Sequence, residues 1–127
     1  MIDWKSKLVK LTMLKPGWDG YDAPTPTLEA LDVAQYFLFA EYPGMQFLTR
    51  LSPCVQGGIG MMFKHTESHK YRTVYLEIDQ AGCAAAMFLD AGKVEACAVE
   101  DDFEGREKFY YQMATFLSDG PTHEVEP

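Results

Sequence analysis

The chain has 127 residues, 47% of them hydrophobic and 24% charged, a size and composition that fit one globular domain and exclude two domains or a wholly disordered chain. Its formal net charge of −8, from 19 acidic and 11 basic residues, argues against direct binding of nucleic acid, whose phosphates need clustered Lys and Arg. The start of the chain lacks an apolar signal segment, and no apolar run approaches the roughly 20 residues that cross a membrane. We therefore expect a cytoplasmic protein.

Two helices are predicted before the first strand. Apolar residues at helical spacing predict the first helix over residues 2–14, and Pro16 ends it. These apolar residues are Trp4, Leu8, Leu11 and Leu14. The second helix is predicted to begin at Thr27, a favourable N-cap, and to stop at Pro43-Gly44. Its many apolar residues predict that it is well buried.

The segment between these helices is predicted to be an ordered loop. Residues 17–26 contain two glycines, two prolines and two aspartates, together with the aromatic residues Trp18 and Tyr21. Such aromatics can hold a loop onto the domain, or they can form a recognition surface. We favour the first role but keep Trp18 and Tyr21 as candidates for binding a partner.

From residue 45 onward the pattern alternates with a period of two, which predicts four or five strands. The turns between the strands are short, so the strands should form an antiparallel meander. Phe47, Thr49 and Leu51 are predicted to share one face of the first strand. Residues 83–89 are apolar on both faces, which predicts a central strand covered on both sides.

A last helix is predicted from about residue 106 to residue 117, because apolar residues again recur at helical spacing. Residues 121–127 are expected to be a frayed tail. The order of elements predicts a single α+β domain over residues 1–127, with two N-terminal helices, the meander and a C-terminal helix. One face of the sheet should be covered by the long helices.

No known catalytic motif is present. His65, Glu67 and His69 could hold a divalent metal, but their spacing matches no zinc motif, and we interpret them as the exposed tip of a hairpin. Cys54 and the other two cysteines, Cys83 and Cys97, are far apart and are expected to be reduced, buried thiols. We predict no catalytic residue, no metal site and no cofactor; a metal-dependent enzyme built on the His65–His69 loop is one alternative.

An acidic segment joins the last strand to the last helix. It contains Glu100, Asp101, Asp102, Glu104 and Glu107. Carboxylates in this position can cap the helix and interact with its dipole, can bind a metal, or can form an acidic patch. We favour capping, and we keep the first four residues as candidates for binding a basic protein surface, such as one that normally holds nucleic acid.

One segment resembles a protein family. Gly17-Trp18-Asp19-Gly20-Tyr21-Asp22-Ala23-Pro24, followed by an apolar helix, is similar to the Trp-Asp-Gly-Tyr-Gly-Ala-Pro loop of small uncharacterised bacterial and phage proteins. Ser52-Pro53 with Gly57-Gly58, and the strand residues 76–78, look like two further landmarks of that family. The chain departs from the pattern at Asp22, where the family usually has Gly. The resemblance covers roughly residues 8–79 and implies a fold and a prokaryotic or mobile-element setting, with no catalytic residue.

The hypothesis that these features favour is a non-enzymatic protein that binds another protein. It would occupy a basic surface on a larger complex, as phage inhibitors of bacterial defence do, anti-CRISPR proteins being the concrete case. A second hypothesis is an accessory protein that forms a homo-oligomer through apolar residues of the last helix. These residues are Phe109, Tyr110, Tyr111 and Phe116.

Overall fold

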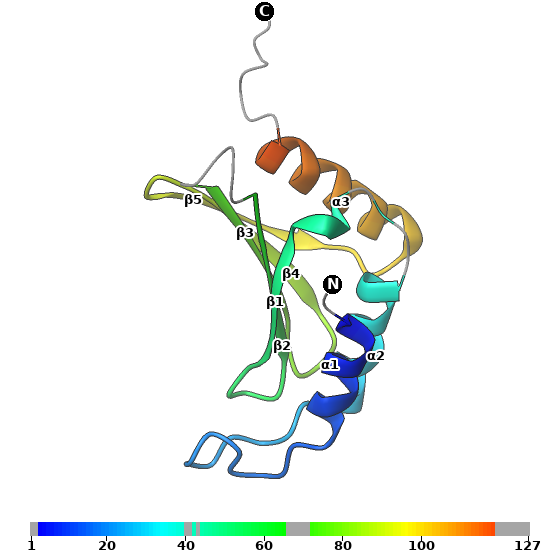
Figure 1. Ribbon diagram of the computed structural model, residues 1–127, viewed down its shortest axis with the longest axis vertical. Coiled ribbons are helices and arrows are strands. Elements are labelled where there is room, and N and C mark those ends of the chain that lie inside the picture. The colour runs from blue at the N-terminus through cyan, green and yellow to red at the C-terminus, as the bar shows by residue number, and fades with distance from the viewer. Residues whose placement is uncertain (1–2, 40–41, 43, 66–71, 119–127) are drawn as a thin grey trace, which may run out of the picture.

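The computed structural model describes residues 3–39, 42, 44–65 and 72–118. In chain order its elements are α1 (Trp4–Thr12), α2 (Leu28–Phe39), a 3₁₀ turn η1 (Met45–Phe47), β1 (Leu48–Pro53), β2 (Ile59–Lys64), β3 (Arg72–Ile78), β4 (Ala84–Asp90), β5 (Lys93–Val99) and α3 (Phe103–Ser118). The strands form one antiparallel sheet in the order β1-β2-β3-β4-β5 (Figure 1). The predicted α+β class, with a five-stranded meander, is therefore confirmed.

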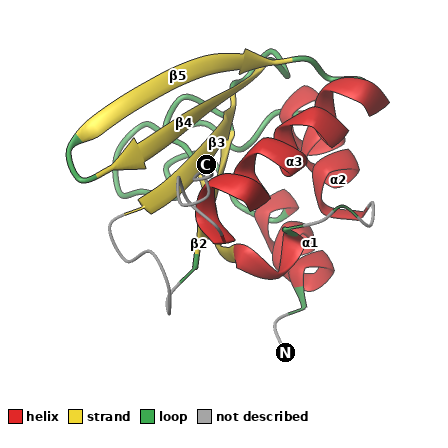
Figure 2. Ribbon diagram, turned by 90° about the horizontal axis from the view of Figure 1, so that it is seen from above, coloured by secondary structure: helices red, strands yellow, loops and turns green. Residues whose placement is uncertain are grey.

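The three helices lie on the same side of the sheet, and the core fills the space between the two layers (Figures 1 and 2). Every second residue of the central strands faces the helices and is buried. These core residues are Ile59, Met61, Phe63, Val74, Leu76, Ile78, Ala84 and Ala86. None of the described helices covers the other face.

The prediction that β4 is covered on both sides is wrong. It lies inside the sheet, between β3 and β5, but Ala85 on its outer face is exposed. Alanine is small enough to be tolerated on either face, so a run of alanines does not distinguish a buried strand from a half-exposed one.

The prediction for the first strand is also wrong, because β1 contains a bulge. Its pairing with β2 shifts between Leu48 and Arg50, which leaves Thr49 as an extra residue. The bulge reverses the alternation, so that Leu48 is buried and Leu51 packs against the core, while Thr49 is exposed.

The starts of the last two helices are defined by capping side chains. Thr27 caps α2, as predicted, by accepting a hydrogen bond from the Ala30 N–H at 3.1 Å. Its hydroxyl also donates to the Gln80 carbonyl at 2.8 Å, which ties the preceding loop to the β3–β4 turn. Helix α3 begins at Phe103, three residues before the predicted start, because Asp102 caps it.

Candidate protein-binding surfaces

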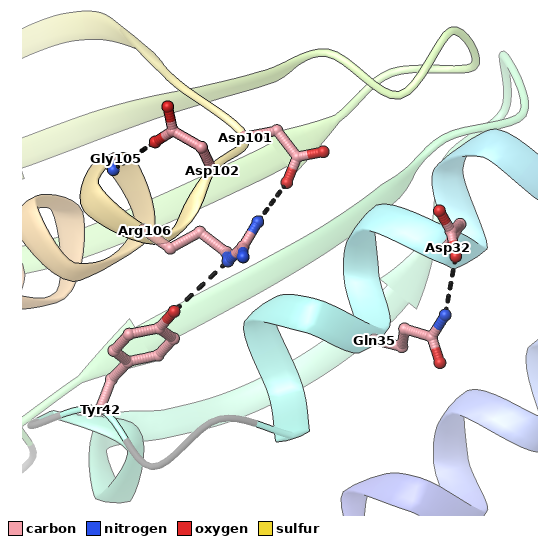
Figure 3. Close-up of polar contacts among 7 residues, drawn as sticks. All are labelled: Asp32, Gln35, Tyr42, Asp101, Asp102, Gly105 and Arg106. Atoms are coloured by element: carbon pink, nitrogen blue, oxygen red, sulfur yellow. Dashed lines mark hydrogen bonds and ion pairs between the residues drawn. The ribbon is translucent and has the colours of Figure 1, made fainter.

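Two residues of the acidic segment hold α3 in place. The Asp102 carboxylate accepts from the Gly105 N–H at 2.7 Å, and the Asp102 carbonyl accepts from the Arg106 N–H at 2.9 Å (Figure 3). Asp101 forms an ion pair with Arg106 at 2.7 Å. The same guanidinium donates to the Tyr42 hydroxyl at 3.3 Å, which links α3 to the chain after α2. The prediction that this segment caps the last helix is thus confirmed for Asp102. Asp101 also has a partner within the domain, Arg106.

The remaining acidic residues of the segment are free to meet another molecule. Glu100, Glu104 and Glu107 are exposed. No hydrogen bond or ion pair joins their carboxylates to another residue in the described part of the chain. Carboxylates without an internal partner keep their full charge available for Lys or Arg on a second protein.

Two aromatic side chains stand on the same side of α3 as Glu104 and Glu107. Phe103 and Tyr111 are each 62% exposed. Residues 103, 107 and 111 follow one another at intervals of four, so their side chains line one face of the helix, with Glu104 beside them. We call this set the α3 outer face (Phe103, Glu104, Glu107 and Tyr111).

The sequence predicted only some residues of the α3 outer face. Glu104 was predicted as a site residue, whereas Phe103 was missed because the helix was expected to begin later. Glu100, which was also predicted, lies against Gly105 on another side of the first turn. The signal that could have found it is the spacing from Phe103 to Glu107 and Tyr111, read once Asp102 is recognised as the cap.

The two aromatic residues of the loop at residues 17–26, Trp18 and Tyr21, have different roles. Trp18 is half-buried and its indole Nε1–H donates to the Pro24 carbonyl at 2.7 Å, so it closes the loop on itself. The Asp19 carboxylate accepts from the Tyr21 N–H at 2.9 Å. Tyr21 itself is 83% exposed, so within this pair Trp18 is structural and Tyr21 is presented to solvent.

Asp22 lies in this loop, and its backbone does not have the positive φ that favours glycine. Among the described residues other than glycine, Ala91 alone has a positive φ. Aspartate at position 22 is therefore accommodated without backbone strain.

The two predicted binding regions do not meet. In Figure 1 the loop lies at the bottom of the molecule and α3 at the top, with α1 and α2 between them. Tyr21 and the α3 outer face would thus contact different parts of a partner.

The aromatic surface predicted for self-association does not exist. Phe109 and Tyr110 are buried, and Phe116 packs against the core, so Tyr111 is the one exposed member of that set. The reason is that α3 packs its apolar stripe against the sheet, where Phe109 meets Phe63 and Phe88 edge to face.

A groove that the sequence did not predict runs between α1 and α2. The second helix was expected to be well buried, but its Leu28 is exposed. The volume of the groove is about 860 Å³. Val9, Leu28 and Phe39 line it, and charges of both signs, including Lys5 and Glu29, stand at its rim. The Lys5 ammonium lies 5.3 Å from the centre of the Phe39 ring.

The described residues contain no group of three or more His, Cys, Asp or Glu side chains placed to hold a metal. Glu67 and His69, predicted as members of an alternative metal loop, lie outside the described residues, while His65 packs against Phe47 with ring centres 4.9 Å apart. All three cysteines are free. The prediction that they are buried is wrong for Cys83 and Cys97, which are exposed, because Cys83 lies in the turn between β3 and β4 and Cys97 lies on the edge strand β5.

No helix in the described part of the chain has the length and apolar character needed to cross a membrane. Comparison with protein-family models, curated proteins and solved structures gave no match.

Proposed function

We propose that this chain is a non-enzymatic protein-binding protein whose α3 outer face docks on a basic surface of another protein. The observation that carries the proposal is the placement of two exposed aromatic rings beside two carboxylates that have no internal partner, Glu104 and Glu107. Exposed aromatics provide most of the binding free energy in many interfaces, and the surrounding charges set orientation and partner choice.

The α3 outer face is suited to binding because its helix is already rigid. The opposite side of α3 is buried through Phe109, Tyr110, Met113 and Leu117. Asp102 and the Asp101–Arg106 ion pair hold its first turn. A preorganised helix loses little conformational entropy when it binds, so its contacts contribute more fully to affinity.

In its narrowest form the proposal places this protein in the cytoplasm as an inhibitor of a bacterial defence complex, as anti-CRISPR proteins are. The net charge of −8 supports long-range attraction to a groove that normally holds nucleic acid. The resemblance of the loop at residues 17–24 to small bacterial and phage proteins supports the setting.

The test is charge reversal on α3 with a matched control on α2. Glu104 and Glu107 are the second and fifth residues of α3, as Glu29 and Asp32 are of α2. Glu104→Lys with Glu107→Lys therefore changes the net charge and the helix dipole in the same way as Glu29→Lys with Asp32→Lys. The α3 variant should recover a specific prey from native cell lysate roughly tenfold less well, and the α2 variant should recover it normally.

Two outcomes would count against this proposal. Equal loss in both variants would mean that net charge, rather than the α3 outer face, attracts the prey. Normal recovery by the α3 variant and also by Tyr111→Ser, with helical content unchanged by circular dichroism, would show that the face is not used. Comparing recovery at low and moderate salt measures the electrostatic part directly.

A further inference from the structure

The two edges of the sheet are protected to very different degrees. Strand β1 is interrupted by the bulge before Arg50 and ends at Pro53, two features that prevent another strand from pairing. Strand β5 pairs with β4 over seven residues without a shift, contains no proline and is exposed along residues 93–98. Such an edge offers a regular row of backbone groups to a further strand.

The outward backbone groups of β5 can be assigned from its hairpin. Asp90 pairs with Lys93 across a two-residue turn, in which Ala91 and Gly92 both have positive φ, as in a type I′ turn. The pair that flanks such a turn exchanges both backbone hydrogen bonds, and the pattern then alternates along the ladder. Val94, Ala96 and Ala98 therefore direct their N–H and C=O groups away from β4.

The charges at the two ends of β5 favour one direction of pairing. Lys93 stands at its start, and Glu100 follows directly after its end. Antiparallel pairing of two copies brings the basic end of each strand to the acidic end of the other, whereas parallel pairing would bring like charges together. We propose that a second copy of this chain pairs antiparallel with β5, which continues the sheet across a two-fold axis.

The register follows from the same residues. Centring the axis on Ala96 pairs all seven residues of both strands and sets Glu95 opposite Cys97 of the second copy. Centring it on Glu95 instead would set two carboxylates opposite each other and shorten the pairing. A groove of about 480 Å³ between β5 and α3, lined by Phe88, Cys97 and Gln112, leaves room beside the strand for the side chains of the second copy.

Sedimentation of the full chain tests the dimer. Wild type should sediment as a dimer at a concentration of ~100 μM. The Ala96→Lys variant should dimerise roughly tenfold or more weakly, because the substitution sets two lysines opposite each other at the axis. Ala85→Lys is the control, because Ala85 is also exposed on the outer face of the sheet but lies on β4. A monomeric wild type, or a dimer that Ala96→Lys leaves unchanged, overturns the proposal.

Cross-linking tests the register without relying on a disruptive variant. In the Glu95→Cys variant, residue 95 should form a disulfide with Cys97 of the second copy under oxidised glutathione, giving a covalent dimer. In the proposed register these two residues are a non-hydrogen-bonded pair, whose Cα atoms lie about 4.5 Å apart, within the range for a disulfide. Glu95→Cys combined with Cys97→Ser should form no such dimer. Mass spectrometry identifies the linked residues, and a link from 95 to 95 or from 97 to 97 would contradict the register centred on Ala96.

Discussion

The three thiols of this protein differ in chemical character although the residue type is the same. Burial raises the pKa of the Cys54 thiol, and the charge of Glu77 raises it further, while the Tyr75 hydroxyl lowers it in part. Cys83 is exposed. The thiolate is the reactive form of cysteine, so a raised pKa reduces the reactive fraction at any pH below it.

We therefore expect iodoacetamide at about pH 8 to modify Cys54 more slowly than Cys83. Mass spectrometry of peptides from a time course measures both rates in one sample. Tyr75→Phe should slow Cys54 further, because it removes the hydroxyl that stabilises the thiolate. Equal rates for Cys54 and Cys83 in the folded protein would contradict the half-buried position of Cys54.

At the scale of a single element, α3 shows how a local preference and a packing requirement conflict. Gly105 lies in the first turn of this helix, where alanine would ordinarily be preferred by roughly 0.5–1 kcal/mol. However, a Cβ at position 105 would come within 2.6 Å of the Glu100 Cβ and closer still to the Glu100 carbonyl. The glycine lets the end of β5 and the start of α3 approach each other.

Gly105→Ala should therefore lower the free energy of unfolding, by about 1–3 kcal/mol, although it raises helix propensity. Chemical denaturation followed by circular dichroism measures the change. Thr115→Ala, at an exposed position of the same helix, is the control and should change stability by less than about 0.5 kcal/mol. If Gly105→Ala instead stabilised the protein, the close approach to Glu100 would be refuted.

At the scale of the whole molecule, one buried hydroxyl joins two helices that are distant in sequence. The Tyr110 hydroxyl on α3 donates to the Phe37 carbonyl of α2 at 2.7 Å. Phe37 belongs to the last turn of α2, whose carbonyls have no partner within the helix. Tyr110 thus satisfies a helix end inside the core, and burial raises its pKa well above the ordinary range.

Tyr110→Phe should lower the free energy of unfolding by about 1–3 kcal/mol, because it removes the hydroxyl that donates to the buried Phe37 carbonyl. The neighbouring Tyr111→Phe is a matched control, since Tyr111 is exposed, and it should leave stability nearly unchanged. Denaturant melts of the two variants compare them directly. Equal stability of both variants would mean that the hydroxyl bond contributes nothing to the packing of α3 on α2.

Much of the fold could be predicted because it rests on interactions between residues close in sequence. The alternation of β3, the turn glycines and the cap at Thr27 each reflect local backbone geometry, and the order of short turns was enough to predict an antiparallel meander. The bulge in β1 was missed because it depends on the pairing with β2, and the early start of α3 was missed because Asp102 was not identified as its cap.

The sequence by itself thus determined the α+β class, the meander and a set of acidic candidates, since periodicity, turns and charge are local properties of the chain. Only the tertiary structure decided which candidates are available. It placed Asp101 and Asp102 in the anchoring of α3, buried Tyr110 while exposing Tyr111, and left the outer edge of β5 without a paired strand among the described residues. The physical reason is that the exposure of a side chain depends on which elements pack against it, and those elements are distant in sequence.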